Sequence, residues 1–117
     1  MKVIIIEDEK LNADHLKSII QKEFEDIEIL ASLNSVASAY SWFVDNDEPD
    51  LIFMDIELGD GTAFDLLDII KIKSNIIFTT AYNQHAIKAF KYNSIDYILK
   101  PVEKAEIKKA IEKWQNQ

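Results

Sequence analysis

The sequence predicts an α/β protein in which one doubly wound parallel sheet carries helices on both faces. Four short apolar runs without alternation are typical of strands that are buried on both sides. Segments with helical periodicity separate these runs, so that strand and helix alternate five times along the chain. Right-handed crossovers then place helices on both faces of the sheet. A length of 117 residues fits a single domain.

The expected strands are short and apolar. Residues 3–6, 51–54, 76–78 and 97–99 form the four continuous runs, which predict strands buried on both faces. Residues 27–31 form a fifth strand that alternates through a glutamate, and this pattern predicts a position at the edge of the sheet.

Five amphipathic helices are expected between and after these strands, because apolar residues recur there at three- and four-residue spacing. Asn34 or Ser35 is the expected N-cap of the second helix, and Asn83 that of the short fourth helix. In chain order, the apolar residues that define the helices are Ala13, Leu16, Ile20 and Phe24; Val36, Ala39, Tyr40 and Phe43; Phe64, Leu67 and Ile70; Ala86, Ile87 and Phe90; and Ile107, Ile111 and Trp114.

The composition excludes several classes of protein. Apolar residues make up 48% of the chain, which is enough for an ordered core. A net charge of -8 opposes direct binding to a nucleic-acid backbone. The absence of cysteine excludes disulfides and thiolate metal sites. The apolar start turns acidic at Glu7, too early for a signal peptide or a membrane span, so we expect a cytoplasmic protein without a membrane partner.

Polar residues follow the carboxyl ends of four expected strands, which is where doubly wound sheets bind ligands. Only two glycines occur, so no glycine-rich phosphate cradle is present. Carboxylates at the end of the first strand would repel phosphate but attract Mg2+, a hard cation that prefers oxygen ligands. The residues at these strand ends are Glu7, Asp8 and Glu9; Asp55; Thr79 and Thr80; and Lys100.

Each of these residues also has a purely structural interpretation. The acidic turn at residues 7–9 could cap the following helix, and Asp55 could be an ordinary turn residue. Lys100 could be a solvated lysine, and Thr80 a β-branched strand terminus. Taken together, however, the set is complete for phosphoryl transfer: a carboxylate nucleophile, a metal-binding acidic cluster, a hydroxyl and an ammonium.

Four segments resemble, in order and spacing, the receiver domain of a bacterial two-component response regulator. They are residues 3–9 (VIIIEDE), 51–58 (LIFMDIEL), 77–81 (IFTTA) and 97–101 (YILKP). The resemblance extends over the whole chain. It implies the flavodoxin-like (βα)5 fold with strand order 2-1-3-4-5, and one receiver domain over residues 1–117 with no effector domain in this chain.

Residues 78–82, 86–90 and 95–97 resemble the LytTR-type subgroup, whose receivers usually precede a DNA-binding domain. We therefore expect the chain to be the receiver of a longer protein, with a stand-alone receiver as the alternative. Gly59 and Ala63 depart from the proline and the glycine that are usual in the family. These departures concern the geometry of the loop after Asp55 and not the reacting groups.

The resemblance implies a phosphorylation-dependent signalling switch. Asp55 would accept a phosphoryl group from a sensor histidine kinase. Asp8, Asp55 and the backbone carbonyl of Glu57 would bind Mg2+, and Glu7 would contact the ion through water. Lys100 would pair with the phosphoryl oxygens. The domain would assist its own phosphorylation and dephosphorylation without being an enzyme.

The resemblance also implies how the signal leaves the site. Thr80 would donate a hydrogen bond to the phosphoryl group, and Tyr97 would then move into the vacated space. Glu57 and Tyr82 would border the phosphoryl group and set its lifetime. The Lys100–Pro101 peptide bond would be cis.

The implied partners are the kinase and a second copy of the chain. Dimerisation would use the face formed by the fourth helix, the fifth strand and the fifth helix, whereas DNA would be bound only through a separate output domain. The polar rim expected around this face consists of Lys88, Lys91, Asp96, Lys104, Glu106 and Lys108.

Two other functions are compatible with parts of the sequence. A pseudo-receiver would bind a partner without phosphorylation, but the intact acids, Thr80 and Lys100 argue against it. A phosphatase of the haloacid-dehalogenase kind is suggested by the acid two residues after Asp55, but that family places its nucleophile after the first strand. We expect surface roles for His15 and His85, and packing roles for the two tryptophans.

Overall fold

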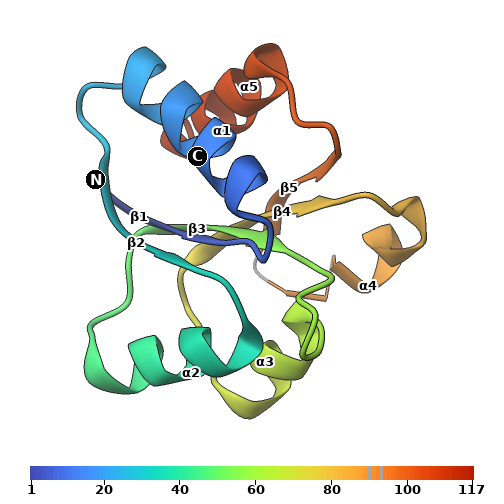
Figure 1. Ribbon diagram of the computed structural model, residues 1–117. Coiled ribbons are helices and arrows are strands. Elements are labelled where there is room, and N and C mark those ends of the chain that lie inside the picture. The colour runs from blue at the N-terminus through green and yellow to red at the C-terminus, as the bar shows by residue number, and fades with distance from the viewer. Residues whose placement is uncertain (90, 93) are drawn as a thin grey trace.

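The computed structural model describes residues 1–89, 91–92 and 94–117, and in these ranges five parallel strands form one sheet in the order β2-β1-β3-β4-β5 (Figure 1). This confirms the predicted doubly wound fold and its strand order. The strands are β1 (Lys2–Ile6), β2 (Glu28–Leu33), β3 (Leu51–Asp55), β4 (Asn75–Thr80) and β5 (Ser94–Leu99). The helices are α1 (Lys10–Glu23), α2 (Val36–Asp45), α3 (Ala63–Ile69), the 3-10 helix η1 (Asn83–His85), α4 (Ala86–Ala89) and α5 (Lys104–Gln115).

The continuous apolar runs are explained by two hydrophobic clusters, one on each side of the sheet. Helices α1 and α5 cover one face, and α2, α3 and α4 cover the other (Figure 1). Successive side chains of a strand point to opposite faces, so that Val3 and Ile5 enter the first cluster while Ile4 and Ile6 enter the second. A strand covered on both sides therefore has to be apolar at every position.

The two edge strands are less buried than the three central ones. In β2, exposed and half-buried residues alternate, which confirms the predicted edge position. The prediction that residues 97–99 are buried on both faces was wrong, because β5 is the opposite edge and its last residue, Leu99, is 44% exposed. Within the described residues, no helix combines the length and the apolar content needed to cross a bilayer.

Side-chain caps fix where two of the helices begin. Ser35 is the N-cap of α2 and forms a capping box with Ser38, which selects one of the two predicted caps. Thr62 caps α3 in the same way through Asp65, a capping box that the sequence analysis missed. The predicted cap at Asn83 was wrong, because this residue lies inside η1 and no side chain caps that helix.

The remaining helix predictions differ from the structure only at their ends. Ile70 is the C-cap of α3 and not part of its last turn. Phe90, expected in the fourth helix, lies outside the described residues. Trp114 is buried in the cluster between the sheet and α5, and Trp42 packs edge to face on Phe43, so both tryptophans have the expected packing roles.

Candidate functional site

The acidic turn after β1 and the end of β3 lie side by side, because β1 and β3 are neighbours and Ile6 is paired with Met54. Glu7 and Asp55 are buried, whereas Asp8 is exposed. One carboxylate oxygen from each of Glu7, Asp8 and Asp55 lies within 4.8 Å of the other two. The fold therefore brings together three carboxylates that the sequence places in two separate segments.

Lys100 supplies the positive charge of this cluster from the end of β5. Its Nζ lies 2.6 Å from Oε1 of Glu7 and 3.0 Å from Oδ2 of Asp55. The Lys100 backbone N–H donates to the Thr80 carbonyl, which continues the pairing of β4 and β5 past the end of the strands. The Lys100–Pro101 peptide bond is cis, as predicted. The predicted nucleophile and the predicted lysine are thus in direct contact.

Charge in the cluster is unevenly balanced. The pKa of Asp55 is raised to about 7, because burial, the largest cause, and the nearby Glu7 carboxylate together outweigh the opposing hydrogen bond from Lys100. Burial lowers the pKa of Lys100, but its bonds to Glu7 and Asp55 outweigh this, so that the net shift is upward and the ammonium form persists. One ammonium beside three carboxylates leaves an excess of negative charge.

A hard divalent cation fits this donor set, because carboxylate and carbonyl oxygens are the ligands that Mg2+ takes. The loop after β3 contains the backbone carbonyl of Glu57, which the family resemblance implies as a further ligand. Glu57 and Thr62 form an antiparallel bridge whose hydrogen bonds are made by Leu58 to Gly61 and by Ala63 to Ile56, so that the bridge does not use the Glu57 carbonyl. The same loop passes close to Asp8, since a Cβ at Gly59 would lie 3.8 Å from Oδ2 of that residue.

Gly59, which replaces the proline usual in the family, has a backbone conformation that proline could not adopt. Its φ is +70°, in the left-handed region that side chains rarely adopt, and the bridge between Glu57 and Thr62 closes the loop around it. Ala63, the other departure from the family, is the buried first residue of α3. Neither position carries a reacting group.

A pocket of about 160 Å³ opens at the carboxyl ends of β3 and β4. It contains the predicted nucleophile, the predicted lysine and both residues expected to border the phosphoryl group. Its lining residues are Asp8, Glu9, Asp55, Glu57, Ala81, Tyr82 and Lys100.

The predicted switch residues lie behind this pocket. Thr80 is fully buried, and its hydroxyl oxygen accepts a hydrogen bond of 3.2 Å from the Tyr82 N–H. Tyr97 is half-buried against the cluster beneath α3 and α4, and its hydroxyl donates to the Tyr82 carbonyl. Burial raises the pKa of Tyr97, although a hydrogen bond with the His85 backbone lowers it. Both switch residues therefore meet at the segment that follows Thr80.

His85 is the site residue that the sequence analysis missed. Its Nε2 lies 2.9 Å from Oε1 of Glu57, a contact at the rim of the pocket that the expected surface role did not specify. The other histidine, His15, is exposed, and its Nε2 lies 3.3 Å from the Val102 carbonyl oxygen, which fits a surface role. No spacing rule predicts the contact, because Glu57 and His85 are 28 residues apart and belong to different segments, the loop after β3 and η1.

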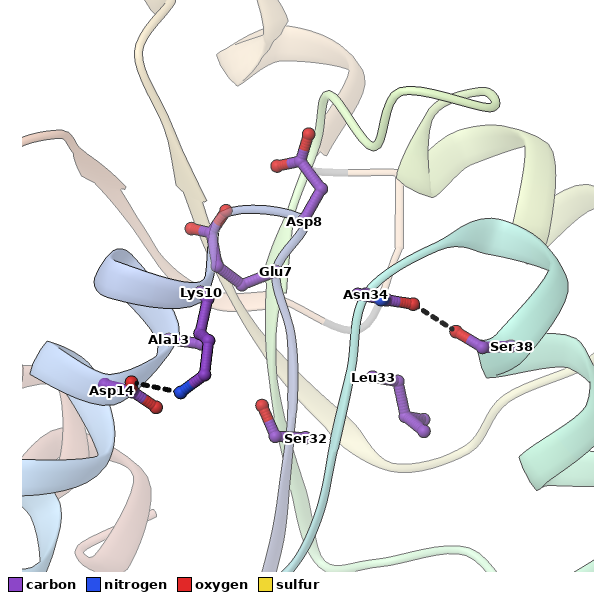
Figure 2. A pocket seen from close by; sticks show the side chains of 9 residues that line it. All are labelled: Glu7, Asp8, Lys10, Ala13, Asp14, Ser32, Leu33, Asn34 and Ser38. Carbon is purple, nitrogen blue, oxygen red and sulfur yellow. Dashed lines mark hydrogen bonds and ion pairs between the residues drawn. The ribbon is translucent and has the colours of Figure 1, made fainter.

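A second, larger hollow of about 390 Å³ lies between α1 and the turn from β2 to α2, with Glu7 and Asp8 at one end (Figure 2). Lys10 and Asp14 form an ion pair of 2.8 Å on its α1 side. On the opposite side, Ser38 donates a hydrogen bond of 3.3 Å to Asn34. The acidic turn therefore separates this hollow from the pocket that contains Asp55.

The sequence matches one family model and is similar to several curated bacterial proteins. A family model described as response regulator receiver domain matches residues 3–112. A Bacillus anthracis protein named sensory transduction protein LytT is 36% identical over 120 residues, covering 100% of this chain and 48% of that protein. A protein of the same name from Enterococcus faecalis is 40% identical over 116 residues, covering 97% and 47% of the two chains. The chain thus spans about half the length of the curated relatives it matches.

Solved structures share the fold. The crystal structure of the response regulatory domain of protein mrkE from Klebsiella pneumoniae is similar with a TM-score of 0.83 and 31% identity over 100% of both chains. A response regulator receiver domain protein from Clostridium thermocellum has a TM-score of 0.81 and 25% identity, covering 98% of this chain and 94% of that one.

Proposed function

The chain belongs to the response regulator receiver domain family, and from this membership we propose that Asp55 accepts a phosphoryl group from a sensor histidine kinase. The observation that carries the proposal is the contact of Lys100 Nζ with Asp55 Oδ2 at 3.0 Å, inside a cluster of three carboxylates. A nucleophile, a cation to neutralise the transferred group and a set of metal ligands are thus within one pocket.

The reaction is an in-line displacement at phosphorus. An oxygen of the ionised Asp55 attacks the phosphorus of the phosphohistidine, and the nitrogen–phosphorus bond breaks with its electron pair on the imidazole. Because Lys100 already contacts the attacking carboxylate, its ammonium is placed to pair with an oxygen of the incoming phosphoryl group. Asp55 must be ionised to attack, and its raised pKa makes neighbouring positive charge important for that ionisation.

Asp8, Asp55 and the backbone carbonyl of Glu57 would hold Mg2+ directly, and Glu7 would contact it through water. When bound, the ion neutralises charge on the equatorial oxygens of the transferred group. The excess of carboxylates over ammonium groups supports this assignment.

The aspartyl phosphate would act through the segment after β4. Thr80 would turn its hydroxyl from the Tyr82 N–H to the phosphoryl group. Because the Tyr97 hydroxyl is bound to the Tyr82 carbonyl, a shift of Tyr82 would also move Tyr97. The surface formed by α4, β5 and α5 would then bind a second copy of the chain. In a protein as long as the relatives named LytT, the receiver would control a DNA-binding output domain.

The test is the phosphorylation of Asp55 itself. The protein is incubated with acetyl phosphate and Mg2+, and the modified residue is located by mass spectrometry. We expect one phosphoryl group on Asp55 in the wild type and in Asp47→Asn, a control at an exposed carboxylate outside the pocket, and none in Asp55→Asn. A labelled Asp55→Asn protein would overturn the assignment. A wild type that no donor labels would favour the pseudo-receiver alternative.

A further inference from the structure

The contact between Glu57 and His85 joins two loops across the edge of the reactive pocket. Glu57 lies in the loop after β3 and lines the pocket together with Asp55, whereas His85 ends η1 and is not among the residues that line the pocket. The Glu57 side chain is 48% exposed, and its Oε1 lies 2.9 Å from Nε2 of His85. The carboxylate is thereby held toward η1.

His85 is itself anchored and can therefore restrain its partner. Its side chain is 22% exposed, and its ring packs against buried Phe64 with 5.9 Å between centroids. Tyr82 lies edge-on to the same ring at 6.4 Å. Since Phe64 belongs to the hydrophobic cluster between the sheet and α3, the histidine ring is held in place by packing against the core.

We propose that His85 is a positioning residue that, through its hydrogen bond, keeps the Glu57 carboxylate away from the phosphoryl group and so prolongs the lifetime of the aspartyl phosphate. This inference rests on the proposed function of Asp55. It assigns to a histidine outside the pocket a role in the dephosphorylation step.

The chemistry of that step gives the direction of the effect. A water oxygen attacks the phosphorus, the bond between phosphorus and the Asp55 oxygen breaks, and its electron pair returns to the Asp55 carboxylate. Both hydrogens of the water stay with the released dihydrogen phosphate. A carboxylate that is free to accept a hydrogen bond from this water would orient it for attack. Glu57 lines the pocket and could do so if it were released, but His85 occupies its Oε1.

The experiment measures the first-order decay of phosphorylated Asp55 at fixed Mg2+ and pH after the donor has been removed. We expect His85→Leu to speed the decay about fivefold, the size of effect typical for loss of one positioning hydrogen bond. His85→Gln keeps an N–H donor at similar reach and should remain within about twofold of the wild type. Gln84→Leu, at the exposed neighbouring position of η1, is the matched control and should not change the rate.

A double-mutant cycle separates positioning from general loosening of the loop. In a Glu57→Gln background, His85→Leu should change the decay by less than about twofold, because the carboxylate that it would release is absent. An equal acceleration in both backgrounds would show that His85 acts only on structure and would overturn the inference. Slower or unchanged decay in His85→Leu would overturn it as well.

The outcomes also distinguish this inference from the proposal on which it rests. Normal labelling of Asp55 with a decay insensitive to His85 would refute the role of His85 alone. A wild-type protein that no phosphoryl donor labels at Asp55 in the presence of Mg2+ would refute the proposed function, and the inference with it.

Discussion

At the scale of single residues, the main feature of the site is a cluster of three carboxylates, of which two, Glu7 and Asp55, are buried. Asp55 is 4% exposed and Glu7 is 6% exposed, yet both are acids, and Lys100 is the one cation placed between them in the described part of the chain. Buried charges are costly unless they are paired. The cluster is therefore expected to destabilise the cation-free protein and to respond strongly to protonation and to metal.

The first prediction concerns pH. The folded-state pKa of Asp55 is raised from 3.8 to about 7, so the favourable contribution of the protonated carboxyl is fully present below about pH 4 and is lost as the pH rises through about 7. Asp55→Asn cannot ionise and should lack this loss. Its free energy of unfolding, measured by urea denaturation with a chelator present, should rise relative to that of the wild type across this window. The raised pKa of Lys100 adds nothing here, since that group stays charged throughout.

Parallel profiles for Asp55→Asn and the wild type would contradict the raised pKa. Asp47→Asn, which removes an exposed carboxylate outside the pocket, serves as the control and should follow the wild type.

The second prediction concerns Asp8, the exposed member of the cluster. Asp8→Asn should weaken Mg2+ binding about tenfold or more, equivalent to at least about 1.4 kcal/mol, because it removes a charged ligand. The cation-free protein should become more stable as repulsion between the acids falls. Calorimetric titration with Mg2+ measures the first effect and thermal unfolding the second.

Asp14→Asn is the matched control for this experiment. Asp14 lines the neighbouring hollow and is paired with Lys10, so that its removal lowers the local negative charge without removing a ligand (Figure 2). Unchanged Mg2+ affinity in Asp8→Asn, or an equal loss in both variants, would place the ion elsewhere.

At the scale of elements, the segment from Thr80 to His85 connects the pocket to the rest of the molecule. Backbone groups of Tyr82 bind the Thr80 and Tyr97 hydroxyls, whereas the residue as a whole is 49% exposed and lines the pocket. The backbone contacts do not depend on the ring. A substitution of the Tyr82 side chain can therefore test whether the ring shields the pocket from water, while both backbone hydrogen bonds are retained.

Tyr82→Ala should speed the loss of phosphate from Asp55 by up to about an order of magnitude, equivalent to about 1.4 kcal/mol of barrier, because water then reaches the phosphoryl group more easily. The measurement is the first-order decay after removal of the donor. Tyr40→Ala, at a tyrosine of similar exposure on α2, should decay like the wild type. Slower or equal decay in Tyr82→Ala would show that the ring does not shield the site.

At the scale of the whole molecule, the face formed by α4, β5 and α5 combines lysines that have partners within the chain with an exposed apolar residue. Lys104 and Lys108 lie 2.7 and 3.6 Å from the carboxylate of Glu23 on α1, and Lys88 lies over the Phe64 ring at 4.7 Å. Three lysines of the predicted polar rim thus have partners within the chain. The exposed Leu99 at the end of the edge strand β5 adds an apolar contact to this face.

Beryllofluoride, a phosphoryl mimic, should shift the protein toward a dimer in analytical ultracentrifugation if this face pairs on activation. Leu99→Ser should weaken that dimer by about 1 kcal/mol or more, as expected for loss of a buried apolar contact. Leu30→Ser, at the opposite edge of the sheet and of comparable exposure, is the control. Equal sedimentation with and without beryllofluoride would count against a dimer switch in this domain.

Much of the fold follows from local patterns in the sequence. Apolar runs without alternation specify central strands, and three- and four-residue spacing specifies helices, because burial on two faces or on one imposes these periods. The edge position of β2 followed from its alternation. The strand-end residues, among them Asp55, Thr80 and Lys100, were found in the same way, since a residue directly after a buried strand must lie at the carboxyl edge of a parallel sheet. Glu57, Tyr82 and Tyr97 followed only from the resemblance to the receiver family.

The sequence by itself thus determined the succession of elements and the residues available at the edge of the sheet, because these depend on neighbours along the chain. Tertiary structure alone decided which of those residues touch. It placed Lys100 against Asp55, 45 residues away, and His85 against Glu57, 28 residues away. It also decided the raised pKa of Asp55 and the exposure of β5. Contacts, burial and pKa values depend on which segments pack together in space. The spacing of apolar residues along the chain does not determine this packing.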